Sequence, residues 1–572
     1  MLINRDRSRR LNRADLTNRE YLYRSSFELG RHILGYELQK ILAAVDWFKS
    51  DQSLKTGVIG YGEGGLLSLY AAALDPRIDA VCMSGASGPR PDGWNEPLDR
   101  NVFGILREFS TTELGILVQP RRLITEFTDW PNVTLEGTGG APAEIRTPDV
   151  ERQRTEIDAV ADFSVRLQVP PDQRGGVTNI FGITSQFCDE QALTVLLGEL
   201  LDHAGSPDQI RATEPGSVTS ARDNLPDRIA ERHQRQLEEI DRHNQALLNL
   251  SSFVREDFLK GLDSSSLDAF STSVEKYRRI FREEVIGRFD RPLLPLNARS
   301  RQTWDTEHWT GHEVMLDVFP DVFAYGVLLV PKNLKPGEKR PVVVCQHGLE
   351  GRPTDTFLDD HRAYHDFAAK LCEQGYITFA PQNPYLFQDR FRTLQRKANP
   401  LGKTLFSIIV PQHQQIVNWL KTQPGVDPER IAFYGLSYGG KSAMRIPALV
   451  TDYCLSICSA DFNEWVRKNA STSEDFSYVW TPEYEIFEWD LGSTFNYAEM
   501  AALICPRPFM VERGHFDGVG RDHWVAHEYA KVRHLYAAKL GIGERTAIEW
   551  FVGPHTINGR GTFEFLKTHL GE

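Results

Sequence analysis

Short apolar runs, separated by polar turns, dominate the C-terminal half of the chain. Residues 311–330 first alternate between polar and apolar side chains and then become apolar, which is typical of paired strands. The segments 341–348 (PVVVCQHG) and 377–384 (ITFAPQNP) are short and largely apolar, like strands buried inside a parallel sheet. The pattern therefore predicts an α/β fold.

Part of this pattern occurs twice. Residues 46–65 (DWFKSDQSLKTGVIGYGEGG) match residues 418–440 (NWLKTQPGVDPERIAFYGLSYGG), and each segment predicts the end of a helix, a strand and a glycine-rich turn. Residues 120–127 (PRRLITEF) match residues 506–513 (PRPFMVER) in the same order. The repeat predicts two doubly wound α/β sheets, of which the first lacks its early strands.

The repeat divides the chain into three parts. We expect residues 1–205 to form an incomplete, degenerate copy and residues 291–572 to form the complete copy. Residues 206–290 contain a charged stretch with helical apolar periodicity, including Leu237 and Leu250, which predicts a helical connector or, as the alternative, a lid. We attribute the missing strands to a truncated start; a homo-oligomer that completes the exposed edge is the alternative.

The strongest local signal is the pentapeptide GLSYG at residues 435–439, which follows an apolar run and precedes a helical segment. In this strand–turn–helix context, the motif G-x-S-x-G places a serine nucleophile on a tight, strained turn. Glycine is needed at both ends because larger side chains would clash with neighbouring strands. The motif predicts that Ser437 is a nucleophile.

A serine hydroxyl needs a general base, because it is a weak nucleophile at neutral pH. His555 follows a strand-like run and lies in a Gly-Pro loop, so we predict that it is the base. The third member of such a catalytic triad is a carboxylate that lies between the serine and the histidine in the sequence, in the order Ser, Asp/Glu, His. Asp517, in the loop after a predicted strand, is the preferred acid, and Glu512, at the end of that strand, is the alternative.

Further residues are candidates for binding the reacting groups. The backbone N–H groups of Tyr438 and Leu349, each in a turn after a buried strand, are predicted to form an oxyanion hole. Residues 461–500 are rich in aromatic side chains, for which stacking on a substrate and plain packing are both open. The candidates for substrate binding are Lys441, Trp465, Trp480 and Trp489, and a solvent-facing position on a helix is the alternative for Lys441.

The first copy lacks the residues of this chemistry. Gly62 stands where the second copy has its nucleophile, and no histidine occurs between residues 33 and 202. Ser–His catalysis is therefore excluded there, and we expect a scaffold. The glycines at 60, 62 and 65, with Asp79, also fit a dinucleotide-binding fingerprint, but the repeat explains them better.

Composition narrows the function further. The 572 residues include 65 Lys and Arg and 78 Asp and Glu, a net charge of −13, which argues against a nucleic-acid partner. No apolar run approaches the roughly 20 residues of a membrane helix, and residues 1–20 lack the apolar core of a signal peptide. We expect a cytoplasmic protein without a membrane partner, with secretion left open if the start is truncated. The seven scattered cysteines indicate buried thiols, and no cofactor or metal is predicted.

Residues 291–572 resemble the α/β-hydrolase superfamily, near the dienelactone hydrolases and acetyl xylan esterases. The resemblance implies a doubly wound parallel sheet and cofactor-free hydrolysis of carboxylic esters by a Ser–Asp–His triad. Lys441, four residues after Ser437, adds a partial likeness to glucuronoyl esterases, although Tyr438 stands where their motif G-x-S-R-x-G-K has arginine. We therefore expect a serine carboxylesterase acting on small acyl, aryl or carbohydrate esters through an acyl-enzyme. The alternatives are a peptidase or amidase, a glucuronoyl esterase and a non-catalytic binding protein.

Overall fold

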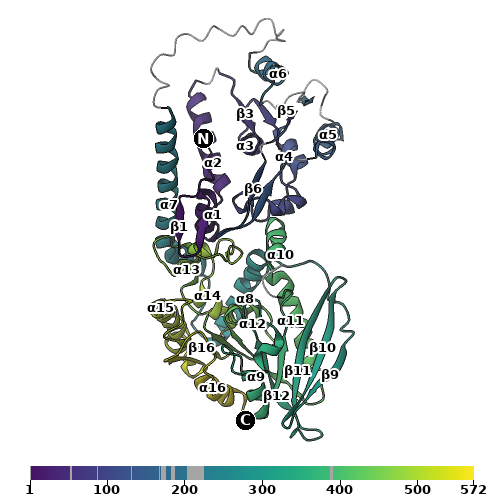
Figure 1. Ribbon diagram of the computed structural model, residues 1–572, viewed down its shortest axis with the longest axis vertical. Helices are drawn as coiled ribbons and strands as arrows, with labels where there is room; N and C mark the ends of the chain where they lie inside the picture. The colour runs from purple at the N-terminus through teal and green to yellow at the C-terminus, as the bar shows by residue number, and fades with distance from the viewer. Residues whose placement is uncertain are drawn as a thin grey trace.

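A computed structural model describes most of the chain, namely residues 2–51, 54–86, 88–130, 132–147, 149–166, 168, 170, 176–181, 187–201, 225–386 and 391–571. Within these ranges, each copy of the repeat contains a sheet with helices packed against it (Figure 1). The boundary predicted between residues 205 and 206 lies outside the described residues.

The larger sheet belongs to the second copy and has nine strands in the order β17-β16-β15-β14-β12-β13-β11-β10-β9. Neighbours from β17 to β13 pair in parallel, whereas β11, β10 and β9 add an antiparallel edge. The strands are β9 (Arg299–Asp305), β10 (Trp309–Phe319), β11 (Val322–Pro331), β12 (Arg340–Gln346), β13 (Ile377–Pro381), β14 (Val426–Leu436), β15 (Leu455–Ser459), β16 (Phe509–Gly514) and β17 (Thr546–Phe551).

Helices cover both faces of this sheet. Successive residues of a strand point to opposite faces, so Val342 and Val344 of β12 join one apolar core while Val343 and Cys345 join another. The first core is covered by α11 (Phe406–Leu420), α12 (Tyr438–Leu449), α14 (Tyr497–Ile504) and α15 (Asp522–Arg533), and the second by α9 (Phe367–Glu373) and α16 (Arg560–Leu570). This arrangement confirms the predicted doubly wound α/β fold.

The smaller sheet belongs to the first copy and repeats one half of the larger one. Its parallel order β3-β4-β5-β8 corresponds to β14-β15-β16-β17. The strands are β3 (Gly57–Tyr61), β4 (Ala80–Ser84), β5 (Arg122–Phe127) and β8 (Val177–Phe181), and the flanking helices are α3 (Glu63–Leu74), α4 (Thr111–Val118), α5 (Val150–Arg166) and α6 (Glu190–Leu200). Within the described ranges, no strand pairs with the outer edge of β3, where β12 pairs with β14 in the larger sheet.

The uncovered edge exposes apolar side chains. Trp47, at the end of α2 (Ile33–Phe48), corresponds in the repeat to Trp419 at the end of α11. Trp419 is 7% exposed and packs near Phe379 of β13, whereas Trp47 is 71% exposed. In the described part of the first copy, no strand occupies the place of those that bury this position in the second copy.

Helices occupy the described part of the predicted connector, residues 225–290. It contains α7 (Leu225–Phe258), α8 (Leu267–Ile280) and a π-helical turn (Phe281–Ile286). Leu237 is buried, but Leu250 is exposed, and the buried face of α7 runs through Asn244 instead. Asn244 is buried because it donates to the Ser26 hydroxyl at 2.9 Å and accepts from the Tyr36 hydroxyl at 2.7 Å. None of the helices in the described ranges has the length and apolar character of a membrane span.

The start of the first copy packs into the second copy. A hairpin, β1 (Arg9–Leu11) and β2 (Ala14–Leu16), precedes α1 (Asn18–Glu28), in which every residue is buried. Tyr21 of α1 lies 5.3 Å from Trp480 between ring centroids, and Phe27 lies 5.3 Å from Trp489. These contacts place α1 beside α13 (Trp465–Ala470) at the junction of the two copies (Figure 1). The start of the first copy therefore joins one apolar core of the second copy, while the smaller sheet has apolar cores of its own.

Candidate active site

Ser437 occupies a strained turn between β14 and α12, with φ of 62° and ψ of −121°. A positive φ is uncommon for a residue other than glycine and is often found at functional sites. The Ser437 N–H donates to the carbonyl oxygen of Ser459 at 3.0 Å. A Cβ atom on Gly435 would collide with the Gly439 carbonyl, and one on Gly439 with the Gln346 carbonyl, so the turn excludes larger residues at both positions.

The Ser437 turn borders a cavity of about 470 Å³ at the carboxyl ends of the parallel strands. Leu349 and Tyr438, the predicted oxyanion-hole residues, line the same cavity. The turn after β12 lies directly against the nucleophile turn, because a Cβ on Gly348 would be 3.1 Å from the Cβ of Ser437. The structure therefore brings both predicted donors to the side of the serine.

His555 and Asp517 lie next to each other in the loops that follow β17 and β16. His555 Nδ1 lies 3.0 Å from Asp517 Oδ1, and Asp517 is buried while His555 is partly exposed. Asp517 is also held by the Val519 N–H at 2.8 Å and by the Arg513 guanidinium at 3.2 Å. No hydrogen bond joins His555 to Ser437, two residues that the structure describes. In enzymes without substrate this contact is often long and shortens in the complex.

Glu512, the alternative acid, has a different environment. Its carboxylate accepts hydrogen bonds from the Ser459 hydroxyl at 2.5 Å, the Tyr434 hydroxyl at 2.9 Å, and the N–H groups of Asn558 at 3.0 Å and Gly559 at 2.9 Å. Burial raises the pKa of Glu512, while these hydrogen bonds oppose the shift. Glu512 therefore ties the loop after β17 to β14 and β15.

The first copy contains the same arrangement around Glu126. Its carboxylate accepts from the Ser84 hydroxyl and from the N–H groups of Cys188 at 3.0 Å and Asp189 at 2.7 Å. Because the first copy has no nucleophilic serine at its turn, these bonds serve the fold and not a reaction. The correspondence indicates a structural role for Glu512 as well.

Lys441 is buried beside the nucleophile turn, which corrects the alternative of a solvent-facing position. It lines the cavity, forms an ion pair with Glu488 at 3.2 Å and donates to the Ile486 carbonyl at 3.2 Å. Burial lowers the pKa of Lys441, and the Glu488 charge opposes this shift. The helix turns this lysine inward because α12 packs with all its residues buried.

The three candidate tryptophans lie in packed positions and not on the cavity wall. Trp465 stacks on Tyr497, Trp480 contacts α1, and Trp489 stacks on His32 of the first copy at 4.1 Å between ring centroids. Phe476 and Tyr478 are the aromatic residues that line the cavity from the same segment. Trp480 and Trp489 have aromatic partners in the first copy, whereas Trp465 is buried among residues of the second copy.

Sequence reasoning missed several residues of the cavity. Lys468 is buried, lines the cavity and donates to the carbonyl oxygens of Phe476, at 3.2 Å, and Val519. Burial lowers the pKa of Lys468 to about 8. Asn12 and Arg13, at the tip of the β1–β2 hairpin, also line the cavity. No local motif marks these three residues, because their place in the site depends on contacts between distant segments.

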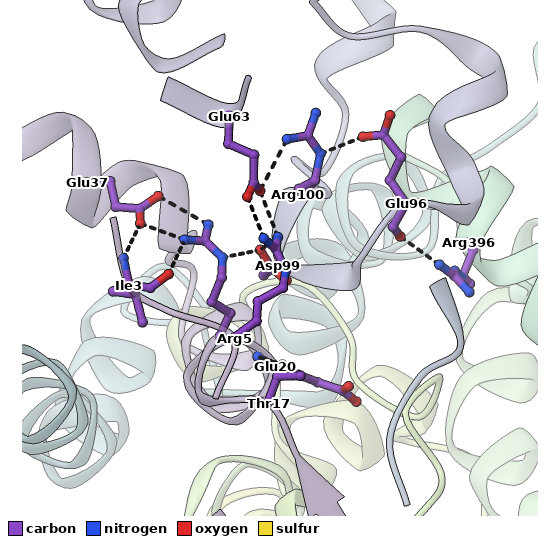
Figure 2. Close-up of polar contacts among 11 residues, drawn as sticks. Ile3, Arg5, Thr17, Glu20, Glu37, Glu63, Glu96, Asp99, Arg100 and Arg396 are labelled. Atoms are coloured by element: carbon purple, nitrogen blue, oxygen red, sulfur yellow. Dashed lines mark hydrogen bonds and ion pairs between the residues drawn. The ribbon is translucent and has the colours of Figure 1, made fainter. Parts of the chain in front are cut away.

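The corresponding turn of the first copy retains the backbone but not the chemistry. Gly62 has φ of 55° and ψ of −120°, close to the values for Ser437. The next residue, Glu63, accepts hydrogen bonds from Arg5 at 2.7 Å and Arg100 at 3.2 Å (Figure 2). Burial would raise the pKa of Glu63, but the hydrogen bond from Arg5 and the nearby arginine charges lower it well below its usual value. Glu63 is thus a paired structural carboxylate.

Comparison with known proteins finds a family that the segment with the nucleophile turn resembles. Residues 325–454 match the model of the Dienelactone hydrolase family. The hydrolase YtaP of Bacillus subtilis (strain 168) is 22% identical over 248 residues, which cover 41% of this chain and 78% of YtaP. These matches confirm the predicted resemblance of this segment to dienelactone hydrolases.

Two solved structures illustrate the distant likeness of this chain to known folds. Acetyl xylan esterase 1 from Thermoanaerobacterium sp. JW/SL YS485 is 15% identical, with a TM-score of 0.37 and coverage of 52% of this chain and 94% of that one. A glucuronoyl esterase from Teredinibacter turnerae T7901 is 15% identical, with a TM-score of 0.39 and coverage of 53% and 85%.

Proposed function

We propose that the chain is a serine carboxylesterase in which Ser437 is the nucleophile, His555 the general base and Asp517 the acid that orients it. The observation that carries the proposal is the strained Ser437 turn at a cavity of about 470 Å³. The loop residues Gly518 and Val519, which directly follow Asp517, line the same cavity. His555 Nδ1 lies 3.0 Å from Asp517 Oδ1, so the proposed base and acid are next to each other.

The proposed reaction has two steps. His555 removes the Ser437 proton as the hydroxyl oxygen attacks the ester carbonyl, and Asp517 stabilises the imidazolium that forms. The N–H groups of Tyr438 and Leu349 hold the tetrahedral oxyanion, a stabilisation of about 3–4 kcal/mol for each donor. His555 then protonates the leaving alcohol, which leaves an acyl-Ser437. Water attacks this acyl-enzyme by the same route and releases the acid.

The cavity supports small polar or aromatic esters as substrates. Its volume of about 470 Å³ is within the range of sites for small molecules. The lining combines charges of both signs, such as Lys468 and Asp461, with the aromatic rings of Phe476 and Tyr478. Burial raises the pKa of Asp461 to about 6, so this carboxyl group is mostly ionised at neutral pH. We infer that aryl or carbohydrate esters fit better than long aliphatic acyl chains.

The proposal is tested by the hydrolysis of p-nitrophenyl esters from acetate to octanoate. We expect kcat/KM to be highest for short acyl groups, and Ser437→Ala to lower it by at least about a thousandfold. Ser442→Ala is the matched control, because this hydroxyl donates to the Tyr438 carbonyl within the helix and lies outside the cavity. Circular dichroism verifies that both variants are folded.

Two outcomes would contradict the proposal. Equal hydrolysis by the wild type and Ser437→Ala would move the chemistry away from this serine. Faster turnover of the matched p-nitroanilides than of the esters would identify an amidase or peptidase that uses the same residues.

A further inference from the structure

The hairpin that begins the first copy reaches the cavity of the second copy. Its two-residue turn consists of Asn12 and Arg13, and both residues line the cavity next to which Ser437 lies. The Asn12 side-chain amide donates to the carbonyl oxygen of Asp475 at 3.2 Å. Residues 463 positions apart in the sequence therefore meet at the edge of one cavity.

Contacts within the first copy hold this hairpin in place. Arg7 donates to the Asp15 carbonyl oxygen at 2.7 Å, and the Asp15 N–H donates to the Gly139 carbonyl oxygen at 3.3 Å. Ala14 and Leu16 of β2 are buried in the shared apolar core. These contacts fix the two strands of the hairpin, so that the side chains of Asn12 and Arg13 at its tip lie at the cavity of the second copy.

The other cations of the cavity already have partners. Lys441 forms its ion pair with Glu488 at 3.2 Å. Lys468 donates to backbone carbonyl oxygens and lies over the Tyr478 ring, with its nitrogen 4.0 Å from the ring centroid. Arg13, by contrast, is exposed, and among the described residues no carboxylate forms an ion pair with it.

Two of the three acids at the cavity are also engaged. Asp475 pairs with Arg521 at 2.6 Å, and Asp461 accepts a hydrogen bond from the Tyr497 hydroxyl. Glu483 is the third acid on the cavity wall. An arginine without a salt bridge keeps its five donors and its positive charge available to a molecule that enters the cavity.

We propose that the catalytically degenerate first copy completes the substrate pocket of the second, and that Arg13 is its specificity-determining residue. Arg13 favours esters that carry a negatively charged group and disfavours esters that carry a positive one. The role rests on the proposed esterase function, and it gives the first copy a part in substrate selection beyond that of a scaffold.

The first test compares three p-nitrophenyl esters of similar size, the succinate monoester, the butyrate and the 4-trimethylammonio-butyrate. We expect Arg13→Ala to lower the ratio of kcat/KM for the anionic ester over the cationic ester by about threefold to tenfold, the effect of one nearby charge in a partly aqueous site. The butyrate value should change little. Arg13→Lys should keep most of the wild-type ratio.

Arg10→Ala is the matched control on the same hairpin. Arg10 pairs with Asp15 at 2.9 Å and does not line the cavity, so its loss should leave the ratio unchanged. The proposal is overturned if Arg13→Ala and the wild type have the same ratio, or if Arg10→Ala shifts it equally. Loss of all hydrolysis in Ser437→Ala, with an unchanged ratio in Arg13→Ala, would leave the esterase function intact and reject only the role of Arg13.

A second test does not require turnover. In a Ser437→Cys background, the new thiolate attacks the sulfur of a methanethiosulfonate, forms a mixed disulfide and releases methanesulfinate. The rates for the sulfonatoethyl and trimethylammonioethyl reagents are measured by mass spectrometry of the peptide that contains position 437. We expect Arg13→Ala in this background to lower the anionic-to-cationic rate ratio by about threefold or more. An unchanged ratio would overturn the proposal even if no ester substrate were found.

Discussion

Asp517 and Glu512 are both buried carboxylates near the end of β16, but their partners differ. Asp517 Oδ1 lies 3.0 Å from His555 Nδ1, whereas the Glu512 oxygens accept hydrogen bonds from hydroxyl and N–H groups of the fold. A carboxylate has about four lone-pair sites, and those of Glu512 are already engaged. The hydrogen-bond partners therefore favour Asp517 as the acid of the proposed triad.

Substitution of these two carboxylates should separate catalysis from stability. We expect Asp517→Asn to lower kcat/KM for p-nitrophenyl acetate by about a thousandfold to ten-thousandfold, because an amide cannot stabilise the imidazolium and favours the wrong tautomer. We expect Glu512→Gln to lower the free energy of unfolding by about 1–3 kcal/mol, because an amide nitrogen would face buried donors. The folded Glu512→Gln enzyme should keep kcat/KM within about tenfold.

Kinetics and thermal denaturation of both variants check this contrast. Asp522→Asn is the control for the loop, because Asp522 pairs with His515 at 2.7 Å and not with His555. The reverse pattern, in which Glu512→Gln is stable but inactive and Asp517→Asn is active, would make Glu512 the acid.

At the scale of elements, α1 holds residues 478–481, part of the cavity wall, through side-chain hydrogen bonds that we call the Arg24 clamp. Arg24 of α1 donates to the carbonyl oxygens of Tyr478 at 3.2 Å, Val479 at 2.9 Å and Thr481 at 2.6 Å. It also forms a buried ion pair with Glu20 at 2.7 Å. A residue of the first copy thereby fixes the backbone that carries Tyr478 into the cavity.

Loss of this clamp should loosen the cavity wall. We expect Arg24→Met to destabilise the protein by about 3–5 kcal/mol, because it removes the cation that neutralises the buried Glu20 carboxylate and a donor to three carbonyl groups. In the folded fraction, KM should rise while kcat changes less. Hydrogen exchange of residues 478–484 measures the loosening directly.

Arg31→Met is the control for this experiment, since Arg31 is exposed just beyond α1. Unchanged exchange in Arg24→Met, together with a normal KM, would show that the wall is ordered without the clamp.

The sequence predicted those elements whose form is dictated locally. The Ser437 turn could be recognised because nearby backbone atoms leave room only for glycine on either side of it. The strands β10 to β13 could be recognised because burial in the sheet gives each of them a local pattern of apolar residues. The packing roles of Trp480 and Trp489 could not be recognised. The same pattern of aromatic residues occurs in a sequence whether the side chains contact a ligand or a helix such as α1. The start of the buried face of α7, at Leu237, was predicted correctly, but its continuation was not, since Asn244 is buried through partners in α1 and α2.

At the scale of the whole molecule, the copies are joined by buried contacts on both sides of the junction. The side chain of Arg396, in α10 (Phe391–Ala398), donates to the carbonyl oxygen of Glu96 of the first copy at 2.7 Å (Figure 2). It also donates to the carbonyl oxygen of Pro142 at 2.7 Å. On the other side, the Glu28 side chain of α1 accepts from the Glu488 N–H at 3.1 Å. The second copy therefore uses the first as part of its interior.

We expect removal of residues 1–224 to leave the second copy without a native core. The truncated chain would expose the apolar bed of α1, including Trp480 and Trp489, and should bind a hydrophobic dye and lose its near-ultraviolet circular dichroism. The full chain with Ser437→Ala is the control, because it lacks the nucleophile but keeps the core. A soluble, monomeric truncated chain with full esterase activity would show that the second copy folds independently.

The turn at Gly62 keeps the backbone of a nucleophile turn without a nucleophile. Its φ and ψ match those of Ser437, and the nearest atoms that a Cβ there would meet belong to Trp130, at an ordinary contact distance of 3.6 Å. The space around the turn therefore accommodates a serine, with the same strained positive φ that Ser437 has. The same bend begins α3, which packs on β3 and β4. A geometry that positions the proposed nucleophile in one copy thus positions a helix on its sheet in the other.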